Sequence, residues 1–248
     1  MKSLIACSTL LAAVSLLAAD KDDVASAAKK LSAADNYSWT TTTEGGRGGG
    51  SSKGKTQSDG LTWTEMTRGD NSTEAVFKGG KAAVKGEDGW EAVDLTATPA
   101  RGGAGGGGGG GGAGGNPGRM MAGMLRNFKA PAAQIEDIID KTKDITKGDD
   151  GYAGDLTEDG AKSLLSFGRG GRRGGAGGGA APAISNAKGS VKVWLKDGVV
   201  TKYVIKVSGT TKNRDGDDMD IDRTTTVEIK DIGATKITVP DEAKTKIS

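Results

Sequence analysis

Polar and apolar residues alternate along two separate stretches of the chain, and a period of two is typical of β-strands with one buried face. In the first stretch the predicted strands are 36–44, 61–67, 74–78, 81–85 and 90–95. In the second stretch they are 190–195, 199–211, 218–229 and 236–239. The turns within 61–95 are rich in glycine and charged residues, and none is long enough for a parallel crossover. The pattern therefore predicts antiparallel meanders.

An apolar residue at every third or fourth position predicts helices elsewhere in the chain. The predicted helices are 22–34, 121–128, 131–148 and 158–167, with a loop over 149–156. In the second helix, Met121, Met124, Leu125 and Phe128 share one face. The order helix, strands, helices, strands predicts an α+β protein whose helices cover one face of an antiparallel sheet.

Glycine is concentrated in three tracts, 45–54, 101–118 and 168–180, which hold most of the 43 glycines of the chain. The tracts carry arginine and lysine but no acidic residue, whereas the whole chain has a net charge of only +2. The remainder of the chain is therefore acidic. Because insertions between elements cost little free energy, we expect a single domain over 20–248 that is interrupted by flexible, basic inserts.

Residues 1–19 have the pattern of a secretory signal peptide. Lys2 precedes an apolar run that is short for a membrane span, and Ala18 and Ala19 offer a cleavage site. We expect this segment to be removed and the mature protein to lie in the periplasm or outside the cell. A buried N-terminal helix and an uncleaved anchor are the alternatives.

The only cysteine, Cys7, follows Leu4-Ile5-Ala6 in an order similar to that of a lipobox. Almost no apolar stretch precedes it, whereas the signal of a lipoprotein has its apolar stretch before the cysteine. This order argues against lipid anchoring through Cys7. Once the signal is removed, the mature chain has no cysteine and forms no disulfide.

The chain has no histidine, which excludes Ser-His-Asp and Cys-His catalysis and Cys/His zinc sites. The acidic cluster Asp218, Asp220 and Asp222 does not match a calcium loop, because Arg223 and Ile229 replace the required glycine and glutamate. We interpret the cluster as the solvated face of a strand, with weak surface binding of a cation as the alternative. The glycine tracts contain no aromatic residue that would stack on bases. We therefore expect no enzyme activity, no cofactor, no metal site and no nucleic-acid partner.

Five segments along the chain carry a family resemblance. They are NYSWTTTTE (36–44), EDGWEAV (87–93), YAGDLTEDGAKSLL (152–165), VKVWLKDGVVTKYVIKVSG (191–209) and TTTVEIKDIGATKITVP (224–240). Together they resemble the LolA/LppX type of bacterial exported carrier. The resemblance implies a curved antiparallel sheet that forms an incomplete β-barrel, helices that cover its concave face, and a gap that holds acyl chains. It also implies a periplasmic role in carrying or sensing lipid or lipoprotein.

Large apolar side chains on the predicted strands, and on the methionine-bearing helix, are the candidates for such a cavity. The candidates are Trp39, Trp63, Met121, Met124, Phe128 and Trp194. An ordinary packed core of the same residues is the alternative. We predict an exported, non-enzymatic protein that binds a lipid or the acyl chains of a lipoprotein and contacts the membrane peripherally. The alternative is an envelope structural or interaction protein with a filled core, whose basic glycine-rich loops contact an envelope protein partner or the membrane surface.

Overall fold

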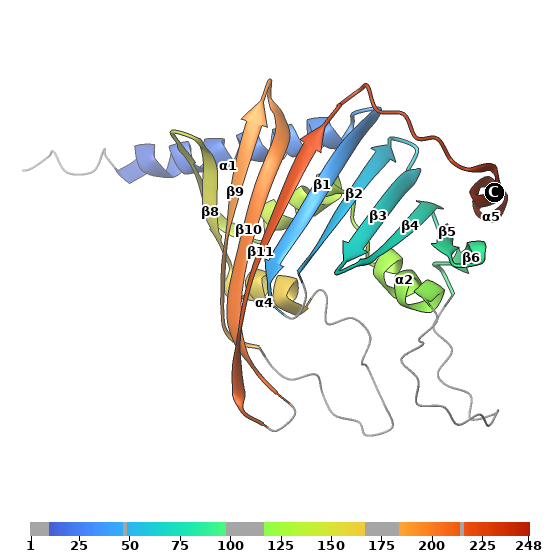
Figure 1. The fold of residues 1–248 in the computed structure, drawn as a ribbon. Coiled ribbons are helices and arrows are strands. Elements are labelled where there is room, and N and C mark those ends of the chain that lie inside the picture. The colour runs from blue at the N-terminus through green and yellow to red at the C-terminus, as the bar shows by residue number, and fades with distance from the viewer. Residues whose placement is uncertain (1–9, 47–48, 98–116, 167–183, 214–215) are drawn as a thin grey trace, which may run out of the picture.

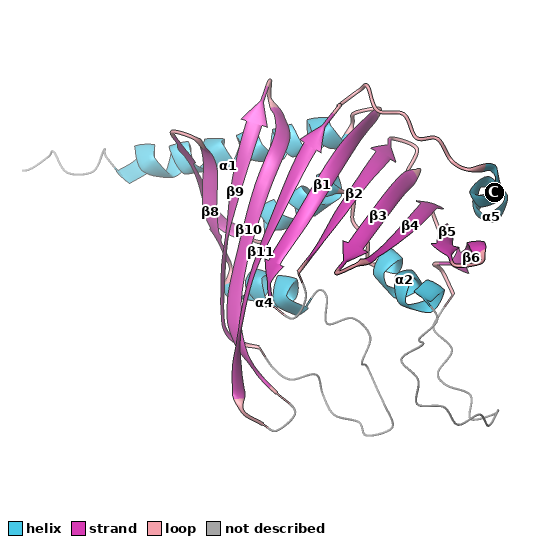
Figure 2. Cartoon of the chain, in the orientation of Figure 1, coloured by secondary structure: helices cyan, strands magenta, loops and turns pink. Residues whose placement is uncertain are grey.

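The computed structural model describes residues 10–46, 49–97, 117–166, 184–213 and 216–248. Within these residues the strands form one antiparallel sheet of 11 strands, in the order β6-β5-β4-β3-β2-β1-β11-β10-β9-β8-β7. The sheet is curved, and its terminal strands β6 and β7 do not pair with each other, so it stays open (Figures 1 and 2). The predicted α+β class with a curved antiparallel sheet is confirmed.

The strands are β1 (Asn36–Gly45), β2 (Gly50–Gln57), β3 (Thr62–Arg68), β4 (Asn71–Lys78), β5 (Lys81–Gly86), β6 (Gly89–Asp94), β7 (Thr142–Gly148), β8 (Gly151–Leu156), β9 (Ser185–Lys196), β10 (Val199–Lys212) and β11 (Asp218–Lys230). The helices are α1 (Leu10–Ser32), α2 (Pro117–Arg126), α3 (Pro131–Asp140), α4 (Glu158–Ser166) and α5 (Asp241–Ile247). Among the helices described, none combines the length and apolarity that crossing a membrane requires.

Helices cover both faces of the sheet, but unequally. The helices α1, α3 and α4 pack on the concave face over β1 and β7 to β11, and α2 packs on the same face over β3 to β6. Only α5, among the helices described, packs on the convex face, over β4 to β6. Figure 1 shows α1 and α4 behind the long central strands and α5 at the opposite end of the sheet. The concave face is therefore the better covered one.

The main core lies between α1, α3 and the concave face. Val24 and Leu31 of α1 and Ile135 of α3 are fully buried there. The phenol of Tyr203, on β10, is buried among them, and its hydroxyl donates a hydrogen bond to Gln134 Oε1 at 2.6 Å. Burial raises the pKa of the Tyr203 hydroxyl well above its ordinary value. The phenol is thus held in its neutral form inside the core.

Stability is expected to fall at alkaline pH because of Tyr203. The unfolded phenol releases its proton near pH 10, whereas the folded one keeps it, so the contribution of Tyr203 is complete below pH 10 and is lost as the pH rises toward the folded pKa. Release of one proton changes the free energy of unfolding by at most about 1.4 kcal/mol per pH unit. Urea unfolding measured between pH 8 and 11 should show that the free energy of unfolding falls less steeply with pH for Tyr203→Phe than for the wild type. An equal pH dependence of the unfolding free energy in both proteins would contradict this account.

The segment between α3 and α4 departs from the sequence prediction. The sequence predicts a helix up to Gly148 and then a loop, whereas α3 ends at Asp140 and the hairpin of β7 and β8 follows. Ile145 extends the isoleucine pattern of the helix, but it packs into the main core from β7. Since Thr142 and Ile145 are the only buried residues of β7, the strand has too little periodicity of its own to be recognised. The strand conformation of β7 therefore depends on its contacts with the rest of the fold.

The first glycine tract contributes to the sheet. Strand β2 begins at Gly50 and pairs with β1 and β3, so the second half of the expected insert at 45–54 is a regular strand. The Trp39 indole lies over Gly54, which leaves no room for a side chain. Glycine is needed here for close packing. Apart from Pro117 and Gly118, at the start of α2, the expected inserts 101–118 and 168–180 lie outside the described residues.

The C-terminal segment also differs from the prediction. The sequence predicts a strand over 236–239, but these residues are outside the sheet and lead into α5. Ala243 of α5 is fully buried against Val76 and Ala83 on the convex face. Trp63 and Trp90 pack at the margin of this cluster. Only seven residues form α5, so its helical state depends on this packing.

The substitution Ala243→Lys is expected to detach α5. A lysine at this buried position has no space and no charged partner within the cluster, so we expect a loss of about 2 kcal/mol in the free energy of unfolding. Thr245→Lys places the same side chain on the exposed side of α5 and should leave stability within about 0.5 kcal/mol of the wild type. Urea denaturation followed by tryptophan fluorescence measures both. An equal effect of the two substitutions would show that α5 does not pack as described.

Candidate functional site

The apolar side chains on the concave face form two clusters, and Phe128 packs against both. The Phe128 ring lies 5.7 Å from the Trp39 ring of the main core and 5.1 Å from the Phe77 ring of the second cluster, measured between centroids. The contact with Phe77 is edge-to-face, at 76°. Phe128 lies between the end of α2 and the start of α3. It therefore joins the two clusters and links α2 to the main core.

The second cluster lies beneath α2. Met121 and Leu125 are buried residues of this helix, and Met124, one position before Leu125, is 52% exposed. The helix packs on a floor of mostly small side chains from β4 and β5, with Met66, Val93 and Leu95 at its margin. The buried floor residues are Ala75, Phe77, Ala82 and Val84. The buried floor residues are all apolar, and the exposed Glu91 of β6 pairs with Val84 at the edge of the floor.

Buried threonines separate the two clusters on the sheet. Thr56, Thr62 and Thr64 of β2 and β3 are buried on the same face as Trp39 and Phe77. The indole Nε1 of Trp39 donates to Thr56 Oγ1 at 3.3 Å, and Thr64 Oγ1 donates to the Lys53 carbonyl at 3.1 Å. These hydrogen bonds satisfy the hydroxyl groups within the sheet. The strip can therefore be buried beneath apolar groups without leaving a polar atom unpaired.

The polar attachment of α2 comes from its last residue. The guanidinium of Arg126 donates from Nε to the Leu95 carbonyl at 3.2 Å and from Nη2 to the Asp94 carbonyl at 3.3 Å. The carboxylate of Asp94 accepts hydrogen bonds from Thr96, which lower the pKa of Asp94. These contacts fix the C-terminal end of α2 to the end of β6. Among the described side chains of the rest of the helix, Met121, Ala122 and Leu125 are buried.

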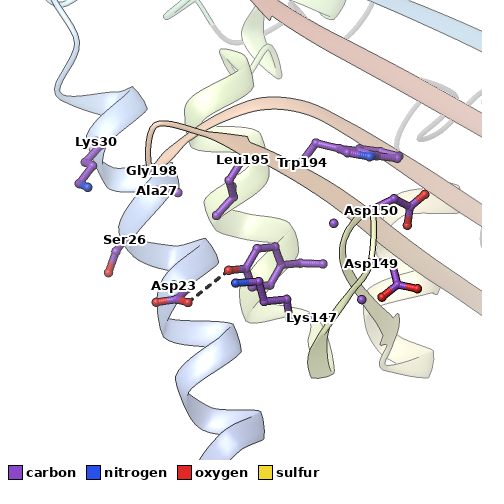
Figure 3. A pocket seen from close by; sticks show the side chains of 13 residues that line it. Asp23, Ser26, Ala27, Lys30, Lys147, Asp149, Asp150, Trp194, Leu195 and Gly198 are labelled. Atoms are coloured by element: carbon purple, nitrogen blue, oxygen red, sulfur yellow. Dashed lines mark hydrogen bonds between the residues drawn. The ribbon is translucent and has the colours of Figure 1, made fainter.

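A polar pocket of about 640 Å³ opens at the far end of the sheet, between α1 and the turn that carries Asp149 and Asp150 (Figure 3). The hydroxyl of Tyr152 donates to Asp23 Oδ2 at 3.2 Å, and the Lys147 ammonium lies 5.7 Å from the Tyr152 ring. The charged groups lining this pocket make it unsuited to an acyl chain. None of its lining residues belongs to α2.

A groove of about 650 Å³ crosses the convex face over β7 to β10. Trp194 lines it, with the ammonium groups of Lys192 and Lys202 at 5.2 and 5.5 Å from the indole ring. Lys202 also pairs with Glu228 at 3.4 Å, and hydrogen bonds from Lys230 and Lys202 lower the pKa of the Glu228 carboxyl. Lys192 pairs with Asp150 at 2.8 Å, so both cations near this tryptophan are already paired with carboxylates of the protein.

The structure brings together part of the set predicted from the sequence. Trp39, Met121 and Phe128 belong to the two concave clusters, and Met124 lies on the exposed side of α2. Trp63 and Trp194 lie on the convex face, because residues that alternate along a strand point to opposite sides of the sheet. The floor residues were not among the candidates. The sequence feature that could have identified them is the alternation in EAVFK (74–78) and KAAVK (81–85). Pairing of the two strands places Ala75 and Phe77 opposite Val84 and Ala82 on one face.

The acidic strand predicted to face solvent does so. Asp218, Asp220 and Asp222 of β11 are exposed, and Asp218 pairs with Lys212 at 2.7 Å. Asp220 accepts a hydrogen bond from Thr210 at 3.0 Å. Within the described residues, no group of three or more acidic or cysteine side chains is arranged to hold a metal ion.

The solved structures to which this chain is similar include LprF and a DUF1329 family protein. LprF from Mycobacterium bovis is similar with a TM-score of 0.45 and 10% sequence identity, over 91% of this chain and 98% of LprF. A DUF1329 family protein from Desulfovibrio piger ATCC 29098 is similar with a TM-score of 0.32 and 7% identity, over 91% of this chain and 95% of that protein. No family model matches the sequence, and no curated protein matches it. The fold implied by the LolA/LppX resemblance, an open curved sheet with helices on its concave face, is the fold observed.

Proposed function

We propose that this protein is an exported, non-enzymatic binding protein that takes up a hydrophobic chain, such as the acyl chain of a lipid or lipoprotein, between α2 and the concave face of β3 to β6. The observation that carries the proposal is the second apolar cluster. It is separate from the main core, joined to it by Phe128, and covered by one short helix. A chain would bind there by replacing the contacts that Met121 and Leu125 make with the floor.

The cover is weakly held compared with the main core. A helix of 10 residues is too short to be stable by itself in water, so α2 depends on its contacts. Among the described side chains of α2, those contacts include the buried Met121, Ala122 and Leu125 and the hydrogen bonds of Arg126. Movement of α2 about the Phe128 link would uncover the floor and leave the contacts of α1 and α3 intact.

The chemistry of the floor favours a long apolar ligand with little selectivity. Ala75 and Ala82 are small, so removal of the Met121 and Leu125 side chains leaves a shallow trough above them. Each methylene group buried against these apolar residues would contribute about 0.8 kcal/mol. Met124 of the same helix is 52% exposed and is not among the residues that pack on the floor.

Binding of a fluorescent fatty acid to the purified protein tests the proposal. We expect saturable binding that unlabelled fatty acids compete away, and a co-purified apolar molecule in native mass spectra of protein taken from the cell envelope. Absence of both would overturn the proposal. It would favour the second candidate, an envelope structural or interaction protein, which is supported by the filled main core beneath α1 and α3.

We further propose that export removes residues 1–19. In the structure α1 runs through this position without interruption, and the two residues after it contact β7. The Lys147 amide donates to Asp20 Oδ2 at 2.9 Å, and the Lys21 ammonium donates to the Thr142 carbonyl at 2.8 Å. Cleavage after Ala19 would leave these contacts in place. The intact mass of the envelope protein should therefore correspond to a chain that begins at Asp20, and a mass that includes residues 1–19 would contradict this.

A further inference from the structure

The two ends of the sheet differ in how their edges are covered. The β7 edge lies against α1, where Asp20 and Lys21 hydrogen-bond backbone groups of Lys147 and Thr142. At the other end β6 pairs only with β5 in the described part of the chain. Natural proteins protect an edge strand from pairing with other chains, so an edge strand that pairs on one side only within the described residues is a surface for strand addition.

The outward backbone groups of β6 follow from its pairing with β5. A two-residue turn, Glu87-Asp88, joins the strands, so the flanking pair Gly86 and Gly89 is hydrogen-bonded. Every second pair after it is also bonded, and the bond from the Leu95 amide to the Gly80 carbonyl at 2.8 Å fits this order. The intervening residues, Trp90, Ala92 and Asp94, therefore direct their N–H and C=O groups away from β5.

These groups suit an antiparallel partner of the same sequence. When Ala92 is placed opposite Ala92 of a second copy, Trp90 lies opposite Asp94 and Glu91 lies opposite Val93. No two like charges then face each other across the junction. Trp90, Ala92 and Asp94 of each strand lie at the hydrogen-bonding positions of this register, with the Asp94 carbonyl also accepting from Arg126 Nη2 at 3.3 Å. The pairing obeys a two-fold axis.

The charges beside β6 favour the same register. The turn residues Glu87 and Asp88 are exposed at one end of the strand, and the Arg126 guanidinium lies at the other end, on the Leu95 and Asp94 carbonyls. Antiparallel pairing brings the acidic turn of each copy alongside the arginine of the other. The edge is thus complementary to itself in both hydrogen bonding and charge.

We infer that β6 is a self-association surface, through which two copies of this chain join their sheets antiparallel about Ala92. The inference does not depend on ligand binding beneath α2. It commits to a second copy of the chain because the pairing groups, the side-chain register and the flanking charges all match under one two-fold rotation. The contact is small, so we expect a reversible dimer whose population rises with protein concentration.

Sedimentation velocity over a series of concentrations tests the inference, with Ala92→Pro as the main variant. Proline removes the outward N–H of residue 92 and leaves the β5 hydrogen bonds intact, because residue 92 does not bond to β5. We expect the wild type to dimerise and Ala92→Pro to remain monomeric at every concentration. Ala92→Val, which keeps the N–H, should dimerise like the wild type. Circular dichroism and urea unfolding show that each variant is folded.

Cross-linking tests the register. With Cys7 replaced by serine, Ala92→Cys should form a disulfide-linked dimer on mild oxidation, because opposed residues in a hydrogen-bonded pair have Cα atoms about 5.5 Å apart. Val93→Cys is the matched control, since residue 93 lies opposite residue 91 of the second copy and should not cross-link. A monomeric wild type, a dimer unaffected by Ala92→Pro, or equal cross-linking at both positions would each overturn the inference.

Discussion

Replacing Gly54 by alanine is expected to lower the free energy of unfolding by roughly 3 kcal/mol. A Cβ at this position would overlap the Trp39 indole and lie 2.8 Å from the Trp63 carbonyl oxygen. The carbonyl belongs to the neighbouring strand β3, so it cannot move without disturbing the ladder between β2 and β3. The indole in turn packs against Phe128. The strain is therefore transmitted to the contact that links the two apolar clusters.

Gly123→Ala is the control for this substitution. Gly123 is exposed on α2, and an added Cβ meets no atom within 4 Å. Alanine has a higher helix propensity than glycine by about 1 kcal/mol, so this variant should be slightly more stable than the wild type. Urea unfolding followed by circular dichroism measures both variants. If Gly54→Ala were as stable as Gly123→Ala, the indole would not lie over β2 as described.

Replacing Met121 by aspartate is expected to weaken fatty-acid binding at least tenfold. Met121 is 6% exposed and contacts the floor, so a carboxylate there would lie where the ligand chain is proposed to bind. Burial of an unpaired charge against apolar groups is strongly unfavourable, and α2 would stand away from the floor. The ligand would then bury less apolar surface against α2, which weakens its binding. Fluorescence titration with a labelled fatty acid measures the change in Kd.

Met124→Asp is the matched control because it adds the same charge to the same helix. Met124 is 52% exposed, so the carboxylate would be solvated and the packing of α2 would be preserved. We expect a change in Kd of less than threefold for this variant. Thermal unfolding of both variants separates a loss of binding from a loss of fold. Equal affinities of the Met121 and Met124 variants would place the ligand away from α2.

The sequence predicts the long strands well because their periodicity is strong. In β10 and β11, apolar residues such as Tyr203, Ile205 and Val227 alternate with polar ones over many positions. The strand β7 and the helix α5 lack such a signal. Thr142 and Ile145 are the only buried residues of β7, and Ala243 is the only buried residue of α5. Their structure is determined by the surfaces on which they pack.

The candidate site was harder to predict, because a strand pattern gives two faces without saying which of them a ligand uses. Trp39, Trp63 and Trp194 have similar sequence surroundings, and pairing across the sheet separates Trp39 from the other two. The floor residues Ala75 and Ala82 are small and had no chemical signature of their own. Their importance follows from the packing of α2 over β4 and β5.

The placement of the tryptophans provides the most direct test of the proposed ligand site. Trp39 lies on the concave face beside Phe128, whereas the other three, Trp63, Trp90 and Trp194, lie on the convex face. Bromine quenches tryptophan fluorescence only at short range. Titration with a brominated fatty acid is therefore performed on two folded variants, one that keeps only Trp39 and one that carries Trp39→Phe. We predict saturable quenching in the first variant and little in the second, and quenching confined to the second would contradict a ligand bound beneath α2.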